Sequence, residues 1–559
     1  MRSKIFIVGL LFLVIGGVWW LRTTAVADDV TDGIVGEAID YRESVAIHEL
    51  PPMLSEPTLD REINPRHNPL QFSADMGKGN TWERTRIPTD PLIDSNRVST
   101  GATPRLDFSF EGVGNPLGCG SCAPPDPSGA VGPNHYVQSV NATKITIFNK
   151  DGTVAKTPFN LGSLWGSGIC ASNTGDGIVL YDQLADRWLI TQFARPSHMC
   201  IAISQTPDPS GNYHLYTFNV TRFPDYFKFG VWSDGYYMSA NEDTYTAYAF
   251  DRDKMLAGDP SASYIKHGGQ TNLLLPADID GSTLPPDSTP AYFYTYKDDD
   301  RAQHNVLTDR IELYELDVDW ATETSTFSLV ASLNVTDFTY TVCGYFNFNC
   351  VRQADTSRRL DTISEWPMFR FPYRNFGTHE SLLGNFVVGG GTGEVGAAIR
   401  WFELRRTDGD WSLYQEGTLD ANDGQDRWLS SIAQDKDGNI AMGYSVSSSE
   451  MHPSIRYAMR YPTDPLGTMR SEQTILDGGG SQTGSNRWGD YAHLSVDPSD
   501  DCSFWFTSEY YDVSATSAWK THIGVFQTPS CNPPEPTIKT VYIPIVIKPY
   551  ADIPTPYQP

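Results

Sequence analysis

The sequence predicts an all-β fold, and three observations support that prediction. From Leu106 onward, short runs of alternating apolar and polar residues are separated by Gly, Asp, Asn and Pro, and no long run has helical spacing. Aromatic residues make up 12% of the chain and charged residues 19%, which is too apolar and too aromatic for a disordered chain. Hairpin-like units also recur along the chain, and their spacing specifies the architecture further.

Each recurring unit consists of a strand, a turn rich in Asp and Gly, and a second strand, as in SIAQDKDGNIAMGYSVSS (431–448) and FGVWSDGYYMSAN (229–241). The turns of seven such units lie near Asp126, Asp182, Asp234, Asp287, Gly377, Asp437 and Asp500. They are 52–63 residues apart except for one gap of 90, which holds an insertion. This period is typical of propeller blades with four strands. We therefore predict a seven-bladed β-propeller, with six or eight blades or a two-sheet sandwich as alternatives.

The N-terminus has the pattern of a secretory signal peptide. Arg2 and Lys4 precede an apolar run at residues 5–21, and Ala-Val-Ala at 25–27 offers a small-residue cleavage site. An uncleaved anchor is the alternative, and no later segment is apolar enough to span a bilayer. We predict that residues 1–27 are the signal peptide and that the protein is secreted or on the cell surface, with no membrane span after cleavage.

Three further segments follow the signal peptide. Residues 28–105 are polar and Pro-rich, and we predict an irregular segment that is either a pro-segment or an arm lying on the main domain. Residues 106–531 contain the repeated hairpins and form the predicted propeller. Residues 532–559 are a Pro-rich tail with one apolar run, VYIPIVI at 541–547, which is either a plain chain end or a strand that docks on the domain.

The charge of the chain limits its partners. The formal net charge is −27, and removal of residues 1–27, which carry three basic residues and no acidic one, takes it to −30. Such a surface repels nucleic acid and anionic lipid. It suits a soluble extracellular protein whose partner is a glycan or another protein, and it attracts divalent cations. The sequence makes no prediction of oligomeric state.

Eight cysteines in a secreted chain indicate disulfide bonds rather than free thiols. Cys119 and Cys122 form a CxxC pattern, but it opens no helix in a βαβ unit and precedes Ala-Pro-Pro, so redox chemistry is not favoured. Sequence alone does not fix the connectivity. Proximity along the chain predicts the pairs Cys119–Cys122, Cys170–Cys200, Cys343–Cys350 and Cys502–Cys531.

Four long stretches have distinctive residue patterns: APPDPSGAVGPNHYVQSVN (123–141), YDQLADRWLITQF (181–193), FGVWSDGYYMSAN (229–241) and RWGDYAHLSVDPSDDCSFWFTSEYY (487–511). They resemble a family of large secreted bacterial propeller-like proteins of poorly defined function. The resemblance spans about residues 115–530. It implies an extracellular propeller-like domain and supplies no established catalytic residue.

Propeller geometry brings a particular set of residues to one face. The residues before the innermost strand of a blade and those after its second strand lie at the same face, because the two strands are antiparallel. The result is a polar channel mouth rich in carboxylates, with aromatic walls, and binding sites favour such concave places. The predicted ligand-binding residues are Asp126, Asp176, Arg370, Arg427, Trp428, Arg487, Trp488 and Tyr510.

Asp490 and Glu509 are the catalytic candidates, with Asp126 as a third. Two carboxyl groups across a sugar can act as acid and as base or nucleophile. The three arginines of the predicted mouth could grip a substrate carboxylate, as a sialidase-like site needs. The competing interpretation is structural, because Asp at strand ends usually caps turns and Arg-Trp pairs often pack between blades. We therefore predict ligand binding at the mouth, with a glycoside hydrolase or lyase as the alternative.

Calcium is the predicted cofactor, if there is one. DKDG (435–438) and DIDG (278–281) look like fragments of a calcium loop, but loop position twelve would be Val446 or Thr289 instead of Glu, so neither is an EF-hand. Asp residues at 298–300 form a further oxygen cluster. The chain has no HExxH, Walker or GxSxG motif.

Overall fold

The structure is a computed structural model that describes residues 33–51, 90–93, 103–301, 304–343, 349–390 and 396–531. In this part of the chain 28 strands fall into seven groups of four, and the strands within each group are antiparallel neighbours. The first group is β3 (Ser128–Val131), β4 (His135–Val140), β5 (Lys144–Asn149) and β6 (Val154–Asn160). The second is β7 (Gly177–Asp182), β8 (Arg187–Ala194), β9 (His198–Ser204) and β10 (Tyr213–Asn219).

The next three groups follow in chain order. The third is β11 (Asp225–Val231), β12 (Gly235–Asn241), β13 (Tyr245–Asp251) and β14 (Ser263–Gln270). The fourth is β15 (Leu275–Ile279), β16 (Ala291–Lys297), β17 (Arg310–Asp319) and β18 (Thr324–Asn334). The fifth is β19 (Phe371–Asn375), β20 (Glu380–Gly390), β21 (Gly396–Arg406) and β22 (Ser412–Leu419), and its inner strand β19 pairs in parallel with β15 of the fourth group.

The last two groups complete the circle. The sixth is β23 (Asp426–Gln434), β24 (Ile440–Ser448), β25 (Met451–Arg460) and β26 (Gln473–Leu476). The seventh is β27 (His493–Val496), β28 (Ser503–Tyr510), β29 (Lys520–Gln527) and β2 (Arg105–Glu111). Thus β2, which precedes all the other groups in the chain, is the outermost strand of the last group and pairs antiparallel with β29.

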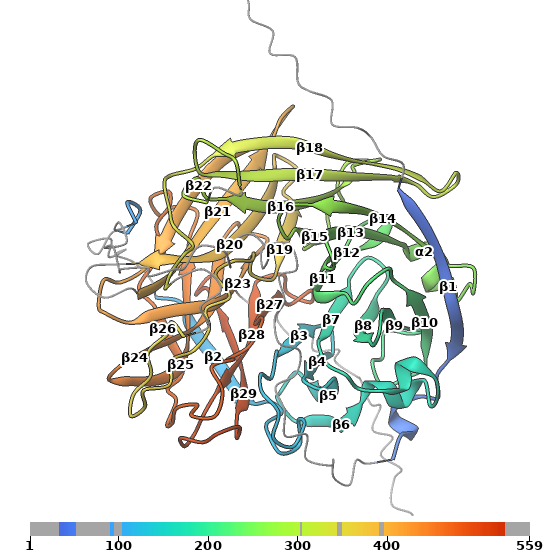
Figure 1. The fold of residues 1–559 in the computed structure, drawn as a ribbon, viewed down its shortest axis with the longest axis horizontal. Helices are drawn as coiled ribbons and strands as arrows, with labels where there is room; N and C mark the ends of the chain where they lie inside the picture. The colour runs from blue at the N-terminus through green and yellow to red at the C-terminus, as the bar shows by residue number, and fades with distance from the viewer. Residues whose placement is uncertain are drawn as a thin grey trace, which may run out of the picture.

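The innermost strands form a closed ring. Each of β3, β7, β11, β15, β19, β23 and β27 contacts the next, and β27 contacts β3. Figure 1 shows these seven strands gathered around the centre of the molecule, with the other strands of each group radiating outward. The predicted all-β propeller is therefore confirmed, and the described groups follow the order of the hairpins in the sequence.

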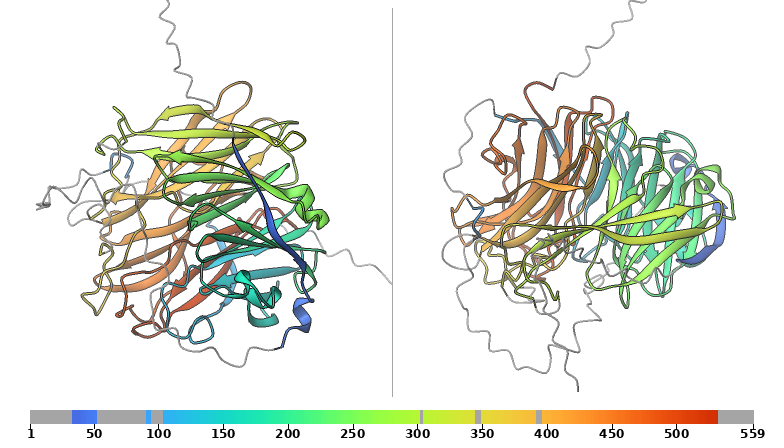
Figure 2. Two further views of the ribbon diagram at one scale, coloured as in Figure 1. Left: turned by 45° about the vertical axis from the view of Figure 1, so that its right-hand side comes forward. Right: turned by 90° about the horizontal axis from the view of Figure 1, so that it is seen from above.

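One further strand comes from the N-terminal segment. β1 (Ile34–Glu43) pairs antiparallel with β14 through its first half and with β10 through its second half, so it joins the outer edges of the second and third groups. Figure 2 shows β1 lying across the outside of these two groups. The described part of the segment thus includes a regular strand, where the sequence predicts irregular structure.

Helical structure is sparse in the described residues and is confined to connections. The 3₁₀ turns are η1 (Ile47–Glu49), η2 (Leu161–Leu164) and η3 (Ile169–Ala171). The α-helix α2 (Arg252–Ala257) begins where the Asp251 carboxylate accepts a hydrogen bond from the Lys254 amide, and it ends at Gly258 with φ = 70°.

Burial follows from the packing of sheet on sheet. β12 and β13 are buried along their whole length, because neighbouring groups cover both of their faces. β18, an outer strand, has one buried residue, and its other residues are exposed or partly buried. All four predicted disulfides are present, Cys119–Cys122, Cys170–Cys200, Cys343–Cys350 and Cys502–Cys531. Within the described residues, no helix has the length and apolar character to cross a bilayer.

Candidate functional site

The predicted channel mouth is covered by other parts of the chain. The Lys228 ammonium lies 3.4 Å from the ring centroid of Tyr226, and that ring lies 4.4 Å from the ring of Trp366, which belongs to the insertion between β18 and β19. Tyr226 also donates a hydrogen bond to the Pro367 carbonyl at 3.3 Å. Trp519 donates to the Cys122 carbonyl at 2.7 Å and so joins two further covering loops. The residues beneath this apolar cover are therefore withdrawn from bulk solvent.

Beneath the cover, buried ionisable side chains from several groups meet at one end of the channel. We call Asp126, Asp176, Asp225, Lys228, Arg487, Asp490 and Glu509 the channel cluster; electrostatic interactions link its members. Four of the predicted site aspartates and glutamates, Asp126, Asp176, Asp490 and Glu509, are thus brought together. Asp126 and Glu509 are each 1% exposed and Asp490 is 5% exposed.

Hydrogen bonds tie Asp126 to neighbouring segments, and an ion pair ties Asp490 to its own loop. Asp126 accepts one from the Asp490 amide at 2.6 Å and one from the Asn141 side chain at 2.5 Å. The Asn141 side-chain oxygen Oδ1 in turn accepts a hydrogen bond from the Asp176 amide at 2.8 Å. Asp490 forms an ion pair with Arg487. Asp126 and Asp490 therefore have the partners of residues that shape a loop, as the structural interpretation expects.

The cluster holds five acidic and two basic side chains, and burial shifts their ionisation. Burial, with a smaller contribution from the charge of Asp490, raises the pKa of Asp126 to about 7. Burial and the neighbouring aspartates hold the pKa of Asp176 well above its ordinary value. Burial lowers the pKa of Lys228 to about 8, although the surrounding aspartates oppose that shift. Some acidic side chains of the cluster therefore retain their protons, which reduces the net negative charge of the cluster.

Glu509 differs from the other carboxylates. Neither of its oxygens has a hydrogen-bond partner within the described residues. Burial, and next the charge of Asp126, raise the pKa of Glu509 well above its ordinary value. A neutral carboxyl at this position is the form that such an environment stabilises, because an ionised one would lack both solvent and a counter-charge.

Two predicted arginines lie elsewhere and are engaged by internal carboxylates. Arg370 is 3% exposed, and its guanidinium donates to Asp278 at 2.6 Å and to Asp280 at 2.7 Å. Arg427 pairs with Asp423 at 2.9 Å and with Glu472 at 3.0 Å. With Arg487 paired to Asp490, each of the three arginines that a sialidase-like grip would need already has a carboxylate partner.

The predicted aromatic walls have packing contacts. The rings of Trp428 and Trp488 lie 6.0 Å apart at 60°, and Trp488 also contacts Tyr511 at 5.7 Å. Tyr510 is on the outer side of the last group, where its hydroxyl donates to Glu111 at 3.2 Å. Tyr510 therefore lies apart from the channel cluster.

The predicted calcium loops have other partners. Asp435 accepts hydrogen bonds from the Asp437 and Asn439 amides at 2.9 and 2.8 Å, as a turn-capping residue does. The third candidate is different. Asp298, Asp299 and Asp309 bring carboxylate oxygens within 4.8 Å of one another. Such a set could contribute to a Ca²⁺ site, which needs six to eight oxygens.

A hollow of about 410 Å³ lies at the opposite face, between the β19–β20 and β21–β22 turns. Its lining combines hydroxyl, carboxylate, guanidinium, imidazole and phenol groups, from Thr378, His379, Arg405, Thr407, Asp408, Asp410, Ser412 and Tyr414. We call it the Tyr414 hollow. The residue Tyr414 is 41% exposed, and the Arg405 guanidinium lies over its ring, 3.6 Å from the centroid. Sequence analysis missed this site because Tyr414 and His379 lie 35 residues apart and share no motif.

No family model and no curated protein matches this chain. Solved structures with a similar strand arrangement include the WD40 domain of SCAP from fission yeast, which is 8% identical with a TM-score of 0.35 over 76% of this chain and 98% of that one. A mutant of AofleA from Arthrobotrys oligospora is 10% identical with a TM-score of 0.32, over 69% and 94%. The α-L-arabinofuranosidase of Podospora anserina is 11% identical with a TM-score of 0.30, over 78% and 99%. These likenesses add nothing about function.

Proposed function

We propose that this chain is an extracellular β-propeller that binds a carbohydrate without cleaving it, and that the Tyr414 hollow is the binding site. The observation that carries the proposal is the exposed ring of Tyr414 in a hollow lined by hydroxyl, carboxylate and guanidinium groups. Sugars present an apolar face and a rim of hydroxyls, so a partly exposed aromatic ring with polar neighbours suits them. The acidic charge, the four disulfides and the signal-like N-terminus support an extracellular location.

Binding at the channel mouth is less well supported. A ligand there would have to displace the cover formed by Trp366 and its neighbours before it reached Asp126 or Asp490.

Hydrolysis by Asp490 and Glu509 is the second candidate function. The observation in its favour is that Glu509 is a buried acid with a raised pKa, which is a common property of general acids.

The test is a binding assay against a panel of oligosaccharides and polysaccharides, with sugar release measured in the same samples. We expect at least one sugar to bind and Tyr414→Ala to weaken that binding about tenfold, or ~1.4 kcal/mol. Leu117→Ala removes an exposed side chain from a loop that joins strands at the covered end and should leave binding unchanged. A protein ligand is the remaining alternative, and sugar binding that Tyr414→Ala leaves intact would place the site elsewhere.

Sugar release decides between binding and catalysis. We expect none from well-folded protein. Release that both Asp490→Asn and Glu509→Gln abolish, without loss of folding, would make the chain a glycoside hydrolase and would overturn the proposal.

Calcium stays a prediction for the carboxylates of Asp298, Asp299 and Asp309. If Ca²⁺ binds there, millimolar Ca²⁺ should raise the melting temperature relative to EDTA, because a ligand that binds the folded state stabilises it. Asp309→Asn should remove the difference. Equal melting temperatures with Ca²⁺ and EDTA would argue against the site.

A further inference from the structure

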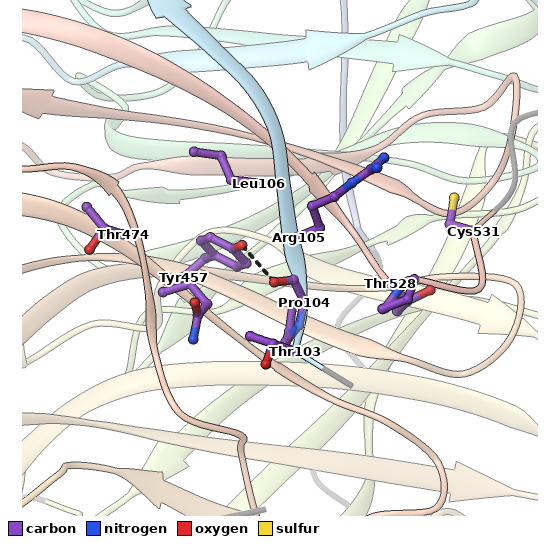
Figure 3. A pocket seen from close by; sticks show the side chains of 10 residues that line it. Thr103, Pro104, Arg105, Leu106, Tyr457, Thr474, Thr528 and Cys531 are labelled. Carbon is purple, nitrogen blue, oxygen red and sulfur yellow. Dashed lines mark hydrogen bonds between the residues drawn. The ribbon is translucent and has the colours of Figure 1, made fainter. Parts of the chain in front are cut away.

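A hollow of about 710 Å³ lies at the rim of the disc. It is formed by the start of β2, the start of β26 and the residues that follow β29 (Figure 3). Thr103, Leu106, Tyr457, Gln473, Thr474 and Cys531 are among its lining residues. We call it the rim groove.

Two strand edges meet at the rim groove. β2 is the outermost strand of the seventh group and β26 is the outermost strand of the sixth, and within the described residues neither pairs with a strand on its outer side. An unpaired edge presents backbone N–H and C=O groups that can accept another strand. Tyr457 of β25 fixes the groove wall, since its hydroxyl donates to the Pro104 carbonyl at 3.4 Å and its ring stacks on Phe526 at 4.0 Å.

The molecule already fills one such position with a strand from outside the repeats. β1 pairs with the outer strands of the second and third groups, at Ile34–Lys266 on one side and Tyr41–Tyr216 on the other. The outer edges of two neighbouring groups can thus be joined by a single strand from a terminal segment. β2 and β26 are likewise outer strands of neighbouring groups, and they contact each other directly.

The chain that follows the last described residue supplies an occupant. Cys531 lines the groove, and the apolar run VYIPIVI at 541–547 begins after nine intervening residues. Nine residues reach about 30 Å when extended, which is enough to return to the groove. The run is rich in β-branched residues, which favour strands. Pro544 lacks an N–H, and proline is tolerated at the edge of a sheet.

We propose that residues 541–547 dock in the rim groove of their own chain as an added strand. The proposal is independent of sugar binding, because the Tyr414 hollow and the rim groove share no residue. In this arrangement a strand from each terminal segment joins two neighbouring groups: β1 joins the second and third groups, and residues 541–547 join the sixth and seventh.

The experiment compares the full chain with a chain that ends at Asn532, which keeps the Cys502–Cys531 disulfide. A synthetic peptide of residues 537–549 is titrated into each. We expect it to bind the shortened chain with a micromolar Kd, and the full chain at least tenfold more weakly, because the tethered tail competes at a high effective concentration. A peptide with Ile543→Asp and Ile545→Asp is the control and should not bind.

Thr474→Arg places a long charged side chain in the groove and should weaken peptide binding to the shortened chain at least tenfold. Thr326→Arg is the matched control, since Thr326 is an exposed residue of the outer strand β18. Failure of the peptide to bind the shortened chain, or binding that Thr474→Arg leaves unchanged, would overturn the proposal. Equal binding to both chains would show that the tail leaves the groove open, and a full chain that is dimeric while the shortened one is monomeric would assign the groove to a second copy's tail.

Discussion

Glu509 shows how a single buried acid can make the stability of the folded protein depend on pH. Its pKa is raised in the folded state, so the folded state holds the proton more tightly than the unfolded chain does. Stability is therefore greatest below the ordinary glutamate pKa and falls as the pH rises above that value. Asp126 adds to this loss up to its folded pKa of about 7.

We predict that Glu509→Gln matches the parent protein in stability at pH 5 and exceeds it by about 1–3 kcal/mol at pH 8, because glutamine cannot ionise. Urea denaturation at the two pH values measures this. The exposed Glu450→Gln should change neither value. Equal destabilisation by Glu509→Gln at both pH values would contradict the prediction, since it would mean that Glu509 is ionised and held by a positive group.

The stability of an Arg370 variant distinguishes a structural role of this residue from a ligand-binding role. We expect Arg370→Met to cost about 3–5 kcal/mol, because it leaves the Asp278 and Asp280 carboxylates buried without a counter-charge. Denaturant unfolding gives the value. Adding Asp278→Asn and Asp280→Asn should restore part of the stability, and a loss below about 1 kcal/mol for Arg370→Met would refute the structural role.

At the scale of single elements, β1 is the strand whose removal leaves the ring intact. A chain that starts at Thr103 lacks β1 and retains β2. We expect it to fold with a lower melting temperature and with faster amide hydrogen exchange in β10 and β14, whose outer edges lose their partner. Unchanged exchange in these two strands would show that β1 adds little to either edge.

Some elements were predictable from the sequence because their signals are local. The turn residues Asp182 and Asp437 and the pairing Cys170–Cys200 involve segments that are close along the chain. β1 was not predictable in this way, because its partners lie more than 170 residues away. Local patterning identifies a hairpin, whereas a strand that pairs only with distant segments gives a weak signal.

The same distinction applies to the candidate site. The placement of Asp126, Asp490 and Glu509 at one end of the channel was predictable, because all three lie at strand ends that the sequence pattern indicates. Their burial could not be predicted. It depends on the insertion between β18 and β19, and the contact of Trp366 with Tyr226 is a tertiary contact that no repeat pattern encodes.

At the scale of the whole molecule, completion of the seventh group depends on β2. A chain that starts at Gly112 lacks both β1 and β2, so β29 loses its outer partner and the last group has three strands. We expect this chain to aggregate or to unfold without a cooperative transition, in contrast to the chain that starts at Thr103. Calorimetry of the two chains side by side makes the comparison, and a cooperative transition for both would show that three strands suffice.

β2 also sets the order in which the protein can be completed. Residues 105–111 leave the ribosome about 400 residues before β29, at residues 520–527, becomes available to pair with them. The seventh group can therefore be completed only after residues 520–527 have been synthesised. Until then β2 is a strand without its partner, and the time the chain spends in that state should govern its yield, because unpaired strands in unfinished chains favour aggregation.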